Sequence, residues 1–167
     1  MARCSESLME NPEFQHLGDM YQRPGFLLRR AHQISAAVFE NACASVELTQ
    51  AQYGALMVLS HEANIDQSRL ARALAFDKVT VLRVLRGLEE RGLVQRDMSL
   101  TNKRQMEVKL TASGRRLVKK SQALAHTAYE QLMSPLTVKQ RTQLLDLLQI
   151  LNTQLCDQAK APFVPLV

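Results

Sequence analysis

The change of hydrophobic period between residues 67 and 110 constrains the fold of this chain more than any other feature. Across 67–75 and again across 78–91, apolar residues recur every three or four positions, which predicts two short helices that each bury one face. Residues 93–94 and 106–110 favour strands, because apolar and polar residues alternate in 106–110. The polar stretch between these strands predicts a β-hairpin. Two short helices joined by a tight turn, with a hairpin after them, predict a winged helix-turn-helix over residues 66–110.

Local capping patterns mark where the helices begin and end. Thr49 and Thr137 are each followed three residues later by a glutamine, which is the spacing of a capping box. Asp66 and Thr111 are N-cap residue types that precede apolar helical patterns. Gly92 stands where a C-cap glycine is expected at the end of the second short helix. We therefore expect long helices on both sides of the winged helix-turn-helix.

The whole pattern predicts a mostly α-helical protein with a small β-wing. Apolar residues make up 46% of the 167 positions, which is enough for a folded core. We expect a flexible leader over 1–22, a helical dimerisation region formed by 23–65 and 111–160, and an apolar tail over 161–167 that can dock on a partner subunit. The last helix has an apolar surface wider than one packing contact needs, so another chain can share it. That surface consists of Leu144, Leu145, Leu147, Leu148, Leu151 and Leu155.

The positive charge of the chain is concentrated in its predicted winged helix-turn-helix. Residues 67–104 contain nine Lys and Arg side chains and four Asp and Glu side chains, which accounts for the entire formal net charge of +5. A basic segment of this kind is expected where a protein binds a polyanion such as DNA. The alternative interpretation is a solvated helix face.

Other functional classes have little support in the sequence. Cys4, Cys43 and Cys156 are far apart and form no Cys-x-x-Cys, so neither a zinc site nor a disulfide framework is expected. The four histidines are scattered and no glycine-rich phosphate loop is present, so we expect no catalytic residues, no metal and no cofactor. No signal peptide or membrane span is apparent, and reduced cysteines suit a cytoplasmic protein.

Several segments of the chain, in this order and spacing, closely resemble the MarR family of winged helix-turn-helix transcription regulators. The resemblance covers about residues 25–155. It is carried by Leu70–Leu74, Asp77–Leu85, Leu88–Arg96, Asn102–Arg104 and Val108–Gly114.

The resemblance implies that the second short helix enters the major groove of duplex DNA with its N-terminal half, while the hairpin tip reaches a minor groove. Arg83 and Arg104 match DNA-contacting positions of the family. Arg83 can make a bidentate contact with guanine or bind a phosphate. The DNA-binding residues that we predict are Ser68, Arg69, Asp77, Lys78, Thr80, Arg83, Arg86, Lys103 and Arg104.

The chain also departs from the family pattern. Val79 and Leu82 stand where small polar residues are common, Arg86 replaces a usual Asp, and Asn102 removes a carboxylate that normally orients an Arg. The operator sequence therefore does not carry over from relatives. Members of the family are homodimers, and each subunit binds half of a palindromic operator.

Many members of the family are repressors that a small anionic ligand releases from DNA. Residues 23–32 look like those of regulators of aromatic-acid breakdown, which suggests a small aromatic carboxylate as effector. The ligand-binding residues that we predict are Arg29, Arg30, His32 and Tyr53; the alternative is that His32 and Tyr53 are core residues.

Two further alternatives are a cysteine-based redox sensor and a winged-helix module that binds protein. Cys4 and Cys43 do not match the position of the sensing cysteine in oxidant-sensing relatives, and the basic hairpin tip argues against a protein-binding module.

Overall fold

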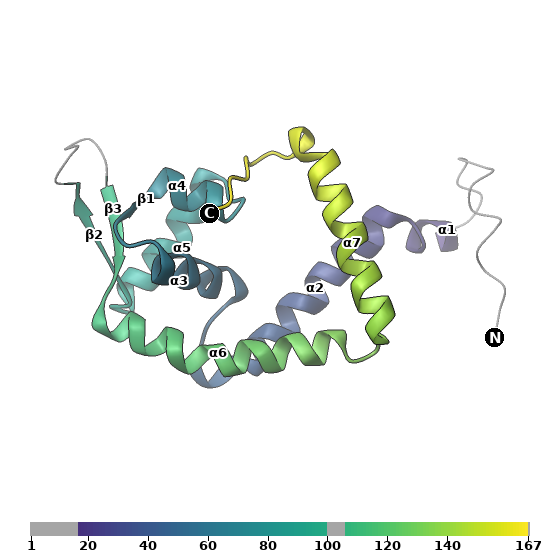
Figure 1. The fold of residues 1–167 in the computed structure, drawn as a ribbon, viewed down its shortest axis with the longest axis horizontal. Helices are drawn as coiled ribbons and strands as arrows, with labels where there is room; N and C mark the ends of the chain where they lie inside the picture. Colours follow the sequence, from purple (N-terminus) through teal and green to yellow (C-terminus); the bar gives the residue numbers. More distant parts are fainter. Residues whose placement is uncertain (1–16, 100–105, 167) are drawn as a thin grey trace. The chain divides into compact units, whose positions relative to one another are not determined.

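The computed structural model describes residues 17–99 and 106–166. The chain forms two compact units, which divide between Ser35 and Ala36 within a long helix. Figure 1 shows the elements in chain order.

The first unit contains two helical segments. Helix α1 spans Leu17–Tyr21, within the stretch 1–22 that is expected to be a flexible leader, and residues 1–16 of that stretch lie outside the described residues. Helix α2 spans Pro24–Ala42 and continues into the second unit. The ring of Phe26 packs edge-on against Tyr21 at 5.1 Å between centroids, and the Arg29 guanidinium lies 5.0 Å from the same ring centroid.

The second unit contains the winged helix-turn-helix and the helices before and after it. After α2 come a short 3-10 turn, η1 (Ala44–Val46), and helix α3 (Gln50–His61). Strand β1 (Ile65–Asp66), helix α4 (Gln67–Ala73) and helix α5 (Lys78–Glu90) follow. Strands β2 (Val94–Met98) and β3 (Met106–Leu110) precede helix α6 (Ala112–Met133). Helix α7 (Val138–Gln154) and turn η2 (Cys156–Gln158) complete the order.

The predicted caps are present at the helix ends. Thr49 and Thr137 each form a complete capping box with the glutamine three residues later. The carboxylate of Asp66 accepts hydrogen bonds from two N–H groups of the first turn of α4, and Thr111 caps α6. Gly92 has a φ of 65°, the left-handed conformation that glycine adopts without steric cost after a helix. These local patterns fixed the helix boundaries as expected.

The three strands form an antiparallel sheet in the order β1-β3-β2. In β2 and β3, Val94 pairs with Leu110 and Met98 with Met106, as the predicted hairpin requires. Strand β1 was not expected, because Asp66 was predicted only as the cap of the following helix. Ile65 pairs with Val108, and both side chains are buried, so this strand covers the second edge of β3.

The core lies where α3, α4, α5, the sheet and the first part of α6 meet. The α5 side chains that face it are Val81, Val84, Leu85 and Leu88. Gly114 lets α6 approach the turn between α5 and β2. A Cβ added to Gly114 would lie only 2.1 Å from the backbone oxygen of Leu93. The Thr111 N–H donates to that same oxygen at 3.1 Å.

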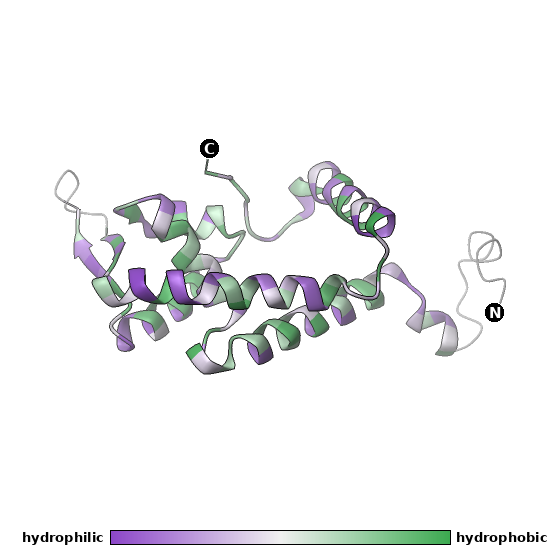
Figure 2. Ribbon diagram, turned by 60° about the horizontal axis from the view of Figure 1, so that its bottom comes forward, coloured by the Kyte–Doolittle hydropathy of each residue, from purple (hydrophilic) through white to green (hydrophobic). Residues whose placement is uncertain are grey.

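Helix α7 buries none of its side chains in the single chain. Figure 2 shows hydrophobic and hydrophilic residues around this helix. Leu147 and Ile150 are 61% and 56% exposed, which leaves the predicted leucine surface open. None of the described helices is both long and apolar enough to cross a membrane.

The segment after α7 packs on its own chain. The Val164 N–H donates to the Arg72 carbonyl at 3.0 Å, and Leu166 packs against the core. The tail was expected to dock on a partner subunit; the structure instead places it on α4 of the same subunit.

Candidate DNA interface

The exposed side of α5 combines cations with apolar side chains. Lys78, Arg83 and Arg86 are exposed on the helix face opposite to the core. Val79 is 75% exposed and Leu82 45% exposed among these charges. Positions three or four apart share a helix face, so these side chains form one continuous surface. Apolar side chains beside arginines are suited to the major groove, where they can contact thymine methyl groups.

Asp77 fixes the beginning of α5. Its carboxylate accepts a hydrogen bond from the Thr80 N–H at 2.7 Å. That backbone hydrogen bond, followed by one from the Thr80 side chain, lowers the pKa of Asp77 below its ordinary value, and the nearby Arg83 charge lowers it further. Asp77 and Thr80 thus stabilise the first turn from which Lys78 and Arg83 project. This gives Thr80 a structural role besides its predicted DNA contact.

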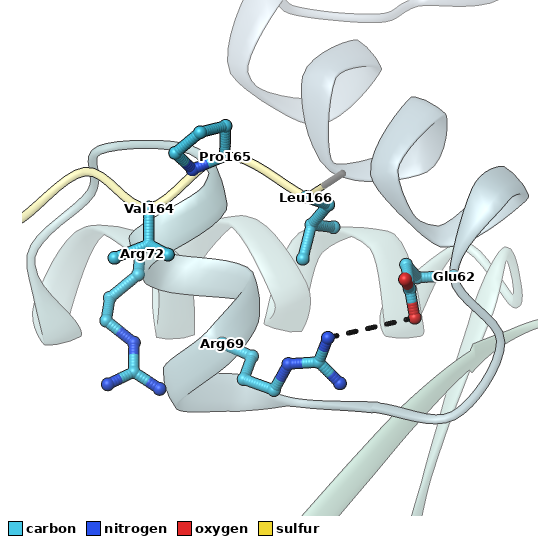
Figure 3. A pocket seen from close by; sticks show the side chains of 6 residues that line it. All are labelled: Glu62, Arg69, Arg72, Val164, Pro165 and Leu166. Atoms are coloured by element: carbon cyan, nitrogen blue, oxygen red, sulfur yellow. Dashed lines mark ion pairs between the residues drawn. The ribbon is translucent and has the colours of Figure 1, made fainter.

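Ser68 and Arg69 lie at the beginning of α4 and are exposed. Their N–H groups donate to the Asp66 carboxylate at 2.9 and 3.0 Å. Arg69 also approaches the carboxylate of Glu62, with 3.9 Å between Nη2 and Oε2 (Figure 3). Because both side chains are substantially exposed, this ion pair is weak and leaves Arg69 able to turn toward a phosphate.

Lys103 and Arg104, predicted at the tip of the wing, lie outside the described residues. The base of the wing is held by two charged pairs. The Arg96 guanidinium binds the Glu89 carboxylate, with Nε at 2.8 Å from Oε2, which ties β2 to α5. Lys109 Nζ lies 2.5 Å from Asp97 Oδ2 across the hairpin. The hydrogen bond from Lys109, followed by that from Gln95, lowers the pKa of Asp97 below its ordinary value. The Arg96–Glu89 pair fixes the wing relative to α5, and the Lys109–Asp97 pair joins the two strands of the wing.

Arg91 was not recognised from the sequence as a positioning residue. Its guanidinium donates to the carbonyls of Glu47 at 2.6 Å and Val46 at 2.9 Å. This contact ties the end of α5 to the turn before α3. The contact spans more than forty residues of sequence, so no local pattern indicated it.

The four predicted ligand-binding residues occupy different environments. Arg29, Arg30 and His32 are exposed on the part of α2 that belongs to the first unit. Tyr53 belongs to the second unit, where its ring lies 5.3 Å from that of Phe39. Burial, followed by the neighbouring Cys43, raises the pKa of Tyr53, so its hydroxyl is neutral at pH 7. Their grouping into one ligand site remains a prediction.

The structure offers no support for a redox role of Cys43. Its side chain is fully buried, and burial raises the pKa of the thiol, which disfavours the reactive thiolate. Among the described residues, no group of three or more His, Cys, Asp or Glu side chains is arranged to hold a metal ion.

Comparison with known proteins decides the family. A family model described as the MarR family matches residues 48–106. Over 131 residues the chain is 30% identical to the HTH-type transcriptional repressor NicR of Pseudomonas putida, and the match covers 78% of this chain and 83% of NicR. The chain belongs to the MarR family.

Solved structures support the winged-helix fold of this MarR-family chain. BpsR of Bordetella bronchiseptica, whose DNA binding is regulated by 6-hydroxynicotinic acid, is 27% identical with a TM-score of 0.75, and the match covers 84% of this chain and 98% of BpsR. The transcriptional repressor CouR bound to a 23-mer DNA duplex is 27% identical with a TM-score of 0.74, and the match covers 83% of this chain and 99% of CouR. The MarR-family chain is thus a DNA-binding transcription regulator rather than an enzyme.

Proposed function

We propose that this protein is a homodimeric repressor that binds a two-fold symmetric operator through α5 and is released by a small aromatic carboxylate. The observation that carries the DNA-binding part is the exposed surface of α5, where Val79 and Leu82 lie among Lys78, Arg83 and Arg86. Exposed apolar side chains on a rigid, cationic helix are stabilised when a groove of DNA covers them. Such a regulator works in the cytoplasm, where its operator lies.

Several predicted contacts follow from this geometry. Arg83 is the proposed base-contacting side chain, because it stands one turn after the capped start of α5. Lys78, Arg86, Ser68 and Arg69 are proposed to bind the DNA backbone. Lys103 and Arg104 are proposed to bind a minor groove.

The dimer proposal rests on α7. This helix buries no side chain in the single chain, although its leucines form an apolar surface. Apolar surfaces of this extent mark contacts with other chains. A two-fold dimer through this surface would present two copies of α5 to successive major grooves on one side of a duplex, which requires half-sites about 34 Å apart.

The effector proposal rests on the cations of α2 and on relatives. Arg29 and Arg30 are exposed and able to neutralise a carboxylate, and His32 and Tyr53 can hydrogen-bond a hydroxylated ring. The similar protein BpsR is regulated by 6-hydroxynicotinic acid, an aromatic carboxylate. A ligand of this kind would release DNA if it binds more tightly to a dimer whose two α5 helices are wrongly spaced.

The test is operator selection followed by ligand titration. Wild-type protein is used to select duplexes from a random pool, and the selected duplex is footprinted. We expect a two-fold symmetric footprint and a dimer in sedimentation. Addition of 6-hydroxynicotinic acid or a hydroxybenzoate should weaken operator binding. A protein that selects no sequence refutes DNA recognition, and operator affinity that no acid changes refutes the effector class.

A redox regulator is the second candidate that the same assay can test. Cys156 is exposed, whereas Cys43 is buried. Peroxide should leave operator affinity unchanged in wild-type protein. Release by peroxide that disappears in Cys43→Ser or Cys156→Ser would support redox sensing in place of ligand sensing.

A further inference from the structure

The segment that follows α7 forms a defined contact with α3 and α4. The Val164 N–H donates to the Arg72 carbonyl at 3.0 Å, which is one of the carbonyls near the end of α4. Phe163, Pro165 and Leu166 line a hollow together with Met57 and Val58 of α3. Figure 3 shows Val164, Pro165 and Leu166 passing over α4 beside Arg72. A backbone hydrogen bond and the partly buried side chain of Leu166, which packs against the core, together hold residues 163–166 in place.

This contact brings the preceding residues to the proposed DNA surface. Lys160, Ala161 and Pro162 form one side of a groove of about 670 Å³. Ser68 of α4 and Lys78 and Leu82 of α5 line the same groove. Residues that lie almost a hundred positions apart in the sequence therefore border one surface.

The charged side chains that line the groove are mainly cationic. Its charged side chains are Arg72, Lys78, Lys160 and Asp77, so cations outnumber the acid by three to one. The Asp77 carboxylate is already engaged by the Thr80 N–H at 2.7 Å. Lys160 is exposed and forms no ion pair with any residue of the described ranges 17–99 and 106–166. An uncompensated lysine at the border of such a surface is suited to a phosphate.

We infer that Lys160, which lies outside the winged helix-turn-helix, is a further phosphate-contacting residue of the DNA interface, held there by the docking of residues 163–166 on α3 and α4. This inference rests on the proposed function, because it assumes that Ser68 and Lys78 face the DNA backbone. It extends the interface beyond the segment that holds all of the net charge.

The experiment measures operator affinity by fluorescence anisotropy across a salt series, with wild-type protein and single variants. Each lysine that neutralises a phosphate contributes about 0.9 to the slope of log affinity against log salt. Lys160→Ala should therefore lower the slope by about 0.9 per subunit, or about 1.8 for a dimer. The matched control is Lys139→Ala on α7. Helix α6 spans 22 residues, or about 33 Å, between the wing and α7, which exceeds the screening length several-fold. The control slope should equal that of wild type.

A second variant tests the docking. Val164→Pro removes the N–H that donates to Arg72 and should reproduce the slope loss of Lys160→Ala. If Val164→Pro does not fold, as judged by circular dichroism, Leu166→Ala is used in its place. A slope that stays at the wild-type value in Lys160→Ala overturns the inference. A slope that falls in Lys160→Ala but not in either docking variant overturns the role of the docked segment.

Failure of the proposed function gives a different result. Lys78→Ala serves as the positive reference, because Lys78 belongs to the proposed interface itself. If Lys78→Ala loses slope and Lys160→Ala does not, the inference is wrong and the proposed function stands. If wild-type protein selects and binds no duplex, the proposed function is wrong.

Discussion

Gly114→Ala should destabilise the protein strongly, although it adds only one methyl group. The added Cβ would lie 2.1 Å from the Leu93 carbonyl oxygen and 3.1 Å from Leu110 Cδ2. To relieve this clash, the beginning of α6 and the turn before β2 must move apart by roughly 1 Å. That movement strains the hydrogen bonds that Thr111 makes to the carbonyls of Gly92 and Leu93, at 2.7 and 3.1 Å.

The expected loss combines two effects. Overpacking costs about 1–3 kcal/mol, and a weakened backbone hydrogen bond costs about 1 kcal/mol. The free energy of unfolding should therefore fall by about 2–4 kcal/mol, which lowers Tm by roughly 5–15 °C for a chain of this size. Denaturant and thermal unfolding are measured at one fixed protomer concentration, because dimerisation contributes to apparent stability.

Gly87→Ala is the matched control. Its Cβ would meet only Nε2 of Gln52, at 3.2 Å, whereas the capping box with Thr49 uses Oε1 of that side chain. Within α5 the exchange of glycine for alanine also favours the helix by up to about 1 kcal/mol. Gly87→Ala should be as stable as wild type or more so. A Gly114→Ala protein that unfolds within about 0.5 kcal/mol of wild type would refute the close packing of α6 on Leu93.

Three further perturbations test other contacts. Arg91→Ala removes the two hydrogen bonds to the Val46 and Glu47 carbonyls and should lower the free energy of unfolding by about 2 kcal/mol, measured with denaturant. Arg91→Lys should recover only part of this loss. Equal stability of wild type and both variants would show that the contact contributes nothing. Asp66→Ala leaves two N–H groups of α4 without their acceptor and should cost about 0.5–2 kcal/mol, whereas Asp66→Asn should restore most of this loss; an alanine variant as stable as the asparagine variant would contradict the cap. The pKa of Asp77 is lowered in the folded state, so its charge stabilises the fold above the ordinary pKa of 3.8, and this contribution disappears as pH falls through the lower folded value. Asp77→Asn keeps a good cap without that charge, so the decline of stability between about pH 5 and pH 2 should be shallower than in wild type, and parallel curves would contradict the assignment.

The sequence predicted those parts of the fold that depend on short-range patterns. The capping boxes at Thr49 and Thr137 and the caps at Asp66 and Thr111 join residues only two or three positions apart. The alternation in β3 identified a strand because Val108 and Leu110 share one buried face. Each of these patterns can be recognised within one helical turn or one strand.

The parts that were missed depend on long-range partners. Strand β1 has two residues, and only its pairing with β3 distinguishes it from a turn. The hydrogen bonds from Arg91 to the carbonyls before α3, and the one from Val164 to Arg72, likewise join residues distant in sequence. In addition, Arg96 was counted as a basic residue of the DNA-binding segment, whereas its charge is engaged by Glu89.

For a related reason, only part of the predicted site could be inferred from the sequence. A helix periodicity places Lys78, Arg83 and Arg86 on one exposed face of α5, so this surface could be inferred locally. A ligand pocket depends on how side chains from separate elements meet. Arg29, Arg30 and His32 belong to one compact unit and Tyr53 to the other, so no periodicity could decide whether they share a ligand.

The central claim, that α5 recognises bases in the major groove, is tested most directly by Arg83→Lys. Lysine keeps the positive charge but cannot make the bidentate contact to guanine that arginine makes. Affinity for the selected operator and for a scrambled duplex is measured by anisotropy at several salt concentrations. Operator affinity should fall about five- to 150-fold for each half-site, in line with the 1–3 kcal/mol of discrimination of a bidentate contact, while affinity for the scrambled duplex and the salt slope stay unchanged. Operator affinity equal to that of wild type would contradict base recognition by Arg83.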